Sequence, residues 1–567
     1  MYHRISMNRN CATIVASLLA VMLNGCTSGN IRSESLKLTA ASCAELAKMR
    51  IPASDIGLPT TGGVITETKM IAASGTGASA IGDYCLVSGN ILPVDPTAPN
   101  IKFQVALPAV WNSKVLMMGG GGFDGSIPNV AGNVANTTAI SPLGRGYVVF
   151  ASDSGHQASP IDGSFALNKE AYGNWIGDAL KKTRDSAFVL VKVTYGSTPT
   201  RSYFLGGSTG GRESLAAVSR WPADWDGNVV LYPGRDVTAQ ILVMLAEARA
   251  LAVPGAFPNF AKRDILHSAA LAACDALDGL TDGVISNVQG CNATFNPSTA
   301  LLHGVPVRCP GGADTGDTCL SDAQLFALKK INGPVRINFS HASGVTSVPG
   351  YNVFISDNNG PPSTSPFQIT IAAMALGNVP PAFPIAGNMS FATQLADNFI
   401  RYAIARDPKF NSLTVDPSNP GVLASRLREF SALDAPDRDL TPFAAKGGKV
   451  LIMHGTEDTL VSPRRTELYV QQLKAKMGTD KVDSFLRFFE VPGFGHSISA
   501  QFNAAWDQLT ALENWVENDV DPAMNQIVTD TVGIPGRTRP LCVYPTWPKY
   551  KGSGDVNSAT SFTCVAN

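Results

Sequence analysis

The chain has 567 residues, of which 44% are hydrophobic and 16% are charged, and its formal net charge is −1. This composition is typical of a globular, core-forming protein and excludes an intrinsically disordered chain. The near-neutral charge, without Lys/Arg clusters, gives no support to nucleic acid or an anionic membrane surface as a partner. At this length we expect two domains, or one domain with a large insertion.

The N-terminus has the features of an export signal. Arg4 and Arg9 precede the apolar run 12–23, which is too short to span a bilayer and is typical of a signal-peptide h-region. The run ends in Leu23-Asn-Gly-Cys26, which resembles a bacterial lipoprotein box. We therefore assign residues 1–26 to a signal peptide of lipoprotein type and expect Cys26 to carry the lipid that attaches the protein to a membrane. Simple secretion is the alternative, because Asn24 is unusual in such a box.

Ten cysteines are present, and eight of them lie beyond the export segment. An even number of cysteines in an exported chain predicts disulfide bonds, although sequence alone leaves their pairing open. No C-x-x-C pair occurs, which argues against a zinc site. The eight residues are Cys43, Cys85, Cys274, Cys291, Cys309, Cys319, Cys542 and Cys564.

The first half of the chain predicts strands that alternate with helices. Residues 27 to about 100 contain short β-prone runs without strong periodicity, and clear apolar runs begin at 101–107. Further buried-type strands are expected at 114–118 and 146–151, and residues 175–195 have helical spacing. This alternation predicts a mostly parallel sheet.

A run of glycines follows the expected strand at 114–118. In Gly119-Gly-Gly-Gly-Phe-Asp-Gly125 the backbone N–H groups are unshielded by side chains, as in the oxyanion hole of an α/β-hydrolase. Gly121 or Gly122 would supply one oxyanion donor. A Gly-rich surface turn is the alternative.

The stretch Leu205-Gly-Gly-Ser-Thr-Gly-Gly-Arg-Glu213 predicts a nucleophile elbow. It has the G-x-S-x-G pattern and stands between a β-prone run at 201–205 and a helix start at 214–219. The glycines allow strand and helix to approach each other on a strained turn. Ser208 would then be an exposed nucleophile, and the N–H of Thr209 would be the other oxyanion donor. An ordinary Gly/Ser loop is the alternative.

The regular alternation stops after Tyr232-Pro-Gly234 and returns near residue 448. Between these points the sequence is rich in cysteines, Pro/Gly/Asn pairs and isolated helical runs. We interpret residues 236–435 as a lid inserted into a hydrolase core that is formed by residues 27–235 and 436–567.

The second part of the core predicts the acid and the base. An apolar strand at 448–455 precedes Asp458, and a strand at 485–491 precedes Pro492-Gly-Phe-Gly-His496. An amphipathic helix is expected at 501–517. The chain order Ser208, Asp458, His496 is that of the α/β-hydrolase fold.

Most of the seven histidines are poor candidates for the general base. His156 and His454 end strands and are better explained as structural, whereas His496 follows the acid on a glycine-flanked loop. We expect His496 to take the proton of Ser208 and Asp458 to orient the imidazole. Glu457 is the adjacent competitor of Asp458.

With these residues, the chain resembles the tannase/feruloyl esterase family, which includes the mono(hydroxyethyl) terephthalate hydrolases. The resemblance covers nearly the whole mature chain and is far more specific than G-x-S-x-G alone. Its motifs are the glycine run at 119–123, Gly-Ser-Thr-Gly-Gly-Arg-Glu around Ser208, the stretch 447–463 that contains Asp458, and Gly493-Phe-Gly-His496.

The resemblance implies an α/β-hydrolase core with a lid, a Ser208/Asp458/His496 triad, and hydrolysis of aromatic-acid esters. It also implies the disulfides Cys43–Cys85, Cys274–Cys291, Cys309–Cys319 and Cys542–Cys564. Family members usually carry two further cysteines, before the serine and after the histidine, that join the two catalytic loops. This chain has Gly207 and Ser497 at those places, so the bridge cannot form and the His496 loop must be held by packing and hydrogen bonds.

The family also carries a calcium ion in the lid. The corresponding run, Cys274 to Val284, holds three carboxylates around glycine turns, and such hard oxygens suit this cation. The resemblance points to the side chains of Asp275, Asp278 and Asp282 and to the carbonyls of Leu280 and Val284. From the residues alone, a solvated acidic turn is an equal alternative, because the spacing is not that of an EF-hand.

The sequence thus predicts an exported serine esterase that acts on small aromatic-acid esters of the feruloyl, galloyl or terephthaloyl type, without an organic cofactor. The alternatives are an esterase or lipase for aliphatic or hydroxyalkanoate esters, and a catalytically silent binding protein of the same fold. Aromatic and basic residues of the lid are candidates for the acyl pocket: Phe367, Phe383, Phe399, Arg401 and Arg406.

Overall fold

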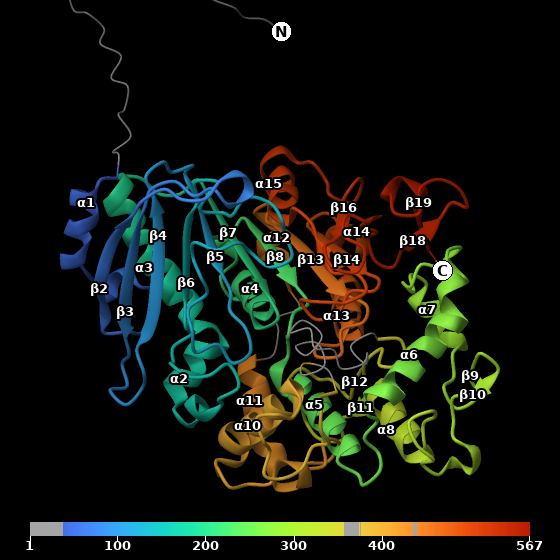
Figure 1. The fold of residues 1–567 in the computed structure, drawn as a ribbon. Helices are drawn as coiled ribbons and strands as arrows, with labels where there is room; N and C mark the ends of the chain where they lie inside the picture. The colour runs from blue at the N-terminus through green and yellow to red at the C-terminus, as the bar shows by residue number, and fades with distance from the viewer. Residues whose placement is uncertain (1–37, 357–373, 375, 435–438, 567) are drawn as a thin grey trace, which may run out of the picture.

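A ten-stranded mixed sheet forms the centre of the molecule (Figure 1). The structure is a computed structural model that describes residues 38–356, 374, 376–434 and 439–566. Four antiparallel strands, which begin the sheet, precede six parallel strands that carry the motifs. In spatial order they are β1 (Arg50–Ile51), β2 (Gly62–Ile71), β3 (Tyr84–Leu92), β4 (Ile101–Pro108), β6 (Val148–Ser152), β5 (Lys114–Met118), β7 (Arg201–Gly207), β8 (Gly227–Leu231), β13 (Lys449–Gly455) and β14 (Leu486–Val491).

Helices cover both faces of the sheet, as an α/β fold requires. One face carries α3 (Ala179–Tyr195), α4 (Thr209–Arg220) and α13 (Pro463–Met477), whose apolar side chains share a buried cluster with the strands. The opposite face carries α15 (Gln508–Asn518), which buries Leu512 and Trp515 against the sheet. The helix expected at 501–517 therefore begins later than predicted, because Ala504–Ala505 forms strand β15 and pairs with Thr529 and Asp530.

Between β8 and β13 the chain leaves the sheet and forms a helical layer with its own core. In Figure 1 these green to orange helices lie below the sheet and to its right. They are α5 (Val237–Leu251), α6 (Phe260–Cys274), α7 (Val288–Thr294), α8 (Asp322–Asn332), α10 (Phe391–Asn398) and α11 (Ala424–Asp434), with short strand pairs β9 (Leu301–Leu302) with β10 (Val305–Pro306) and β11 (Val335–Arg336) with β12 (Ser347–Val348).

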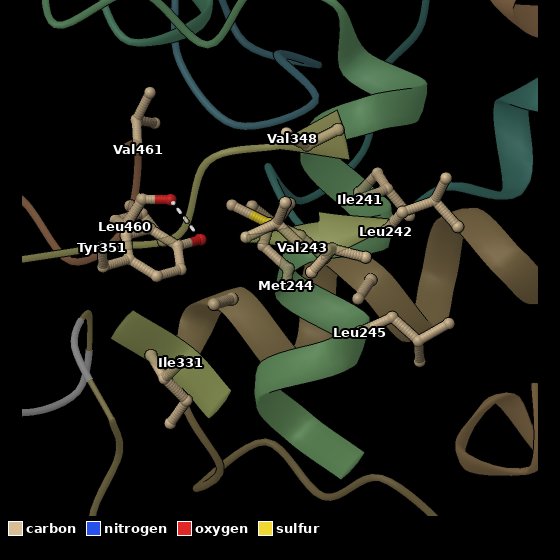
Figure 2. Close-up of a cluster of buried hydrophobic side chains, with 14 of the residues drawn as sticks. Ile241, Leu242, Val243, Met244, Leu245, Ile331, Val348, Tyr351, Leu460 and Val461 are labelled. Carbon is tan, nitrogen blue, oxygen red and sulfur yellow. Dashed lines mark hydrogen bonds between the residues drawn. The ribbon is translucent and has the colours of Figure 1, made fainter. Parts of the chain in front are cut away.

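Helix α5 packs this helical layer, which the sequence analysis interprets as a lid, onto the loop that follows β13. Figure 2 shows its side chains beside Tyr351, Leu460 and Val461, which belong to the same buried cluster. The Leu460 carbonyl accepts hydrogen bonds from the Tyr351 hydroxyl (3.4 Å) and the Gln240 amide (2.9 Å). The lid core and the Asp458 loop are therefore one packed unit.

Four disulfides fasten the periphery, and they are the pairs that the resemblance implies: Cys43–Cys85, Cys274–Cys291, Cys309–Cys319 and Cys542–Cys564. The remaining elements are α1 (Ala40–Glu45), α2 (Lys169–Gly173), α12 (Thr441–Ala445), α14 (Thr479–Asp483), β16 (Ile527–Asp530), β17 (Thr538–Pro540), β18 (Trp547–Tyr550) and β19 (Phe562–Val565). The described helices include none with the length and apolarity needed to cross a membrane. Residues 1–26, which we expect to be a signal peptide, and with them Cys26, lie outside the described residues.

Candidate active site

Ser208 occupies a strained turn between strand β7 and helix α4. Its backbone angles are φ 58° and ψ −123°, which a non-glycine residue adopts only under constraint. The close approach of strand and helix demands small residues, since a Cβ on Gly206 would lie 2.5 Å from the backbone of Gly210. The G-x-S-x-G pattern therefore produces the local geometry of a nucleophile elbow.

The side chains of Ser208, His496 and Asp458 form one hydrogen-bonded chain. Ser208 Oγ lies 3.0 Å from His496 Nε2, and His496 Nδ1 lies 2.7 Å from Asp458 Oδ2. His496 stands on the loop after β14 and Asp458 on the loop after β13, so three parallel strand ends deliver the three groups to one point. Glu457, the alternative acid, is buried, but its neighbour Asp458 is the residue that contacts His496.

Asp458 is completely buried and remains ionised because donors surround it. Its Oδ1 accepts the N–H groups of Leu460 and Val461, each at 2.8 Å. Burial alone would raise the pKa of Asp458, but the charges and hydrogen bonds of His496 and His454 together outweigh it and hold the pKa below its usual value. A buried carboxylate of this kind can orient an imidazole and stabilise its charged form.

His454, which the sequence suggested to be structural, belongs to this network. Its Nε2 lies 3.1 Å from Asp458 Oδ2 and 2.9 Å from the Val461 carbonyl, and both are acceptors, so Nε2 carries the hydrogen. Its Nδ1 contacts the Thr466 hydroxyl at 2.9 Å. The position of His454 at the end of an apolar strand was the one feature of the sequence that marked this residue. Its contact with Asp458 was not predictable.

The glycine run after β5 is tied to the first turn of α4. The Gly120 N–H donates to Glu213 Oε2 (3.1 Å), and the Gly210 N–H donates to the Gly120 carbonyl (3.0 Å). The Thr209 hydroxyl donates to the Gly122 carbonyl at 2.5 Å. The Gly120 amide therefore already has a carboxylate partner. Gly121 and Gly122 lie with Ser208 along one cavity, and their role as the oxyanion donor beside Thr209 stays a prediction.

A cavity of about 340 Å³ opens at Ser208 and His496, a volume at the small end of ligand pockets. Its apolar wall includes side chains from the core and from the lid, and Asn129 and Asn133 contribute amides. The larger apolar residues are Met118, Val134, Leu205, Met374, Phe391 and Leu460.

The acyl-pocket candidates that the structure describes do not line this cavity. Phe399 is buried in the lid core beside Phe123, and Phe383 is exposed. Arg401 pairs with Asp397 at 2.7 Å, and Arg406 donates to the Leu167 carbonyl. Phe367 lies outside the described residues.

The acidic run of the lid contains donors of the right chemistry for calcium. Asp275 and Asp278 are buried, and burial, with a smaller contribution from the repulsion of Asp282, raises the pKa of Asp275. Burial raises the pKa of Asp278 to about 6, with Asp282 and Asp275 adding to the shift. However, Arg539 contacts Asp282, and within the described residues no three acidic, His or Cys side chains converge closely enough to hold a metal ion. The oxygen donors are those that calcium prefers, but the three carboxylates do not lie close enough together to bind one ion.

Comparisons with known proteins identify the family of the chain. Residues 85–565 match the family model described as tannase and feruloyl esterase. The chain is 40% identical to an uncharacterized esterase of Agrobacterium fabrum, over 92% of this chain and 93% of that protein. It is 32% identical to the mono(2-hydroxyethyl) terephthalate hydrolase of Piscinibacter sakaiensis, over 86% of each chain.

Solved structures show the same fold. The feruloyl esterase B of Aspergillus oryzae superposes with a TM-score of 0.73 at 21% identity, covering 92% of this chain and 100% of that one. The tannin acyl hydrolase of Aspergillus niger gives a TM-score of 0.67 at 20% identity, covering 93% and 96%. The chain is therefore a carboxylic ester hydrolase of the α/β-hydrolase fold, and it belongs to the tannase and feruloyl esterase family.

Proposed function

We propose that the protein is a serine esterase that hydrolyses esters of aromatic acids through an acyl-enzyme. The chain of contacts from Ser208 Oγ to His496 Nε2 (3.0 Å) and from His496 Nδ1 to Asp458 Oδ2 (2.7 Å) carries the proposal. This arrangement allows His496 to remove the serine proton while the buried carboxylate stabilises the imidazolium.

In the first half-reaction, Ser208 Oγ attacks the ester carbonyl carbon and its proton passes to His496 Nε2. The carbonyl oxygen, now negative, accepts hydrogen bonds from the Thr209 N–H and from Gly121 or Gly122, a contribution of about 3 kcal/mol per donor in related sites. The tetrahedral intermediate collapses, and His496 returns the proton to the departing alcohol. In the second half-reaction a water molecule gives its proton to His496, attacks the carbonyl carbon of the acyl-enzyme and releases the acid from Ser208.

Aromatic acyl groups are supported by the relatives and by the cavity. Relatives carry the names mono(2-hydroxyethyl) terephthalate hydrolase and probable feruloyl esterase, and both names denote aromatic acids. The Phe391, Leu205 and Met374 side chains offer an apolar surface for a ring. The test compares wild type with Ser208→Ala on methyl ferulate, methyl gallate, a terephthalate monoester and p-nitrophenyl butyrate. Ser208-dependent turnover of an aromatic-acid ester supports the proposal, whereas turnover of the butyrate alone would assign the enzyme to aliphatic esters.

Two further features complete the proposal. The side chains of Asp275, Asp278 and Asp282, with the carbonyls of Leu280 and Val284, would draw together around a structural calcium ion, which would relieve the repulsion among these carboxylates. The four disulfides fit an oxidising compartment, so the chain is exported, and Cys26 attaches it to a membrane through a lipid. Metal analysis of the purified protein and mass analysis of its N-terminus test these two points.

A further inference from the structure

Tyr232 fills the space between the Ser208 turn and His496. Its ring is buried and lies edge-to-face on the His496 imidazole, with 4.8 Å between the centroids. On its other side a Cβ at position 207 would lie 2.7 Å from Tyr232 Cε2 and Oη. A side chain at 207 would therefore force the Tyr232 ring to move, and glycine leaves room for the ring.

Asn136 connects this tyrosine to the backbone that carries His496. The Tyr232 hydroxyl donates to Asn136 Oδ1 (2.9 Å), and the Asn136 amide nitrogen donates to the carbonyls of Ser497 and Ala504 (3.1 Å each). Every hydrogen-bonding group of the amide faces a complementary partner, which fixes its orientation. The backbone carbonyl of Asn136 accepts a hydrogen bond from the backbone N–H of Trp506 at 3.0 Å.

The hydrogen bond from Asn136 reaches the His496 loop at a residue with an unfavourable backbone conformation. Ser497, directly after His496, has a φ of 62°, a conformation that is unfavourable for a residue with a side chain. Tyr232 is itself anchored, because its N–H donates to the Met453 carbonyl (2.7 Å) at the end of β13. The ring and the amide thus join the Ser208 turn, the end of β13 and the His496 loop without a covalent bond.

We propose that Tyr232 and Asn136 are positioning residues that hold His496 toward Ser208, acting as a pair through the Tyr232 hydroxyl. The inference rests on the proposed serine mechanism. Proton transfer demands close alignment, and a displacement of about 1 Å can cost about 100-fold in rate. The Tyr232 ring packs against one side of the His496 imidazole and limits its movement, while Asn136 holds the backbone that follows His496.

The experiment measures kcat and KM of Tyr232→Phe and Asn136→Ala on p-nitrophenyl butyrate and methyl ferulate. We expect kcat to fall about 3- to 10-fold for Tyr232→Phe, the usual effect of one hydrogen bond, and about 10- to 100-fold for Asn136→Ala, with KM changed less than about twofold. Because the pair acts through one bond, the double variant should equal Asn136→Ala. Unchanged kcat in Asn136→Ala would overturn the proposal.

Matched controls separate positioning from stability. Tyr203→Phe removes a hydroxyl that donates to Glu517 (2.6 Å). Asn112→Ala removes an amide that lies away from the site and contacts the Arg145 carbonyl and the Lys114 N–H. We expect these controls to change the melting temperature as much as the test variants do but to leave kcat unchanged. An equal loss of kcat in the controls would contradict a specific role for Tyr232 and Asn136.

The decisive arm repeats both substitutions in a His496→Ala background. Residues that act through one group lose their effect when that group is gone. The residual Ser208-dependent hydrolysis of p-nitrophenyl butyrate should therefore not fall further. The same fold-loss as in wild type would assign Tyr232 and Asn136 to substrate contact or general structure and overturn the proposal. If wild type shows no Ser208-dependent turnover, the proposed function fails first and the positioning role falls with it.

Discussion

His454 Nε2 lies 3.1 Å from Asp458 Oδ2, the same carboxylate oxygen that lies 2.7 Å from His496 Nδ1. Two imidazoles thus share one buried acceptor, and only His496 also reaches Ser208. His454 therefore helps to fix the carboxylate that orients the general base.

Replacement of His454 tests this relationship. His454→Leu removes the donor and should lower kcat about 10-fold, because the buried carboxylate loses a partner that defines its position. His454→Gln places an amide N–H where Nε2 stood and should retain most of the rate. Steady-state kinetics with melting curves check this, and a Gln variant as impaired as the Leu variant would contradict it.

The contact between the Thr209 hydroxyl and the Gly122 carbonyl joins the two sides of the expected oxyanion hole. Thr209→Val keeps the shape but leaves that carbonyl without its donor, and we expect kcat to fall about 10-fold with little change in KM. Thr209→Ser, which retains the hydroxyl, is the control. Equal kcat in the Val and Ser variants would show that the tie is not needed for catalysis.

Asp434 gives the fold a pH dependence at the base of the lid. Burial, and then repulsion from Asp236, raises the pKa of Asp434, while its carboxyl accepts the Thr238 N–H at the start of α5. The folded state therefore keeps this proton to a higher pH than the unfolded chain does. This contribution to stability is present at low pH and is lost as the pH rises above about 4 and through the raised pKa.

Asp434→Asn keeps the acceptor for α5 and carries no charge. Its free energy of unfolding should fall less steeply between about pH 4 and pH 8 than that of wild type. Urea denaturation across this range measures the two slopes. Parallel slopes would mean that Asp434 ionises equally in the folded and unfolded chains.

If calcium binds as proposed, its removal should loosen the acidic loop and, through it, the His496 loop. Val284 lies against Gly493, and Arg537 donates to both the Asp282 and Gln501 carbonyls. Dialysis against a chelator should lower the melting temperature, and added calcium should restore it. Asp278→Asn should have the lower melting temperature from the start and should not respond to calcium. A wild-type protein that is indifferent to the chelator would contradict the calcium site.

The parallel strands and the residues at their ends were predictable, because apolar runs end directly in Ser208, Asp458 and His496 or close to them. Strand β2 was not predictable, since its stretch from Thr66 to Lys69 is polar and mostly exposed. The late start of α15 was also missed, because the pairing of Ala504 with Asp530 overrides the helical spacing.

The residues around the triad depend on contacts that span the chain. The bond from Asn136 to Ser497 joins residues 361 positions apart, and no local pattern marks either partner. Phe399 was predicted as a candidate for the acyl pocket but packs against Phe123 and Phe430, because aromatic residues in a lid first build its own core. Periodicity identifies which side chains are apolar, but not which cavity they face.

The most direct test of the account is the reaction of the protein with a fluorophosphonate probe, read by intact mass and peptide mapping. The serine mechanism predicts one adduct, on the peptide that contains Ser208, and none in Ser208→Ala, which should also have lost ester hydrolysis. His496→Ala should label far more slowly, because the serine then lacks its base. A Ser208→Ala variant that hydrolyses esters like wild type would contradict the central claim.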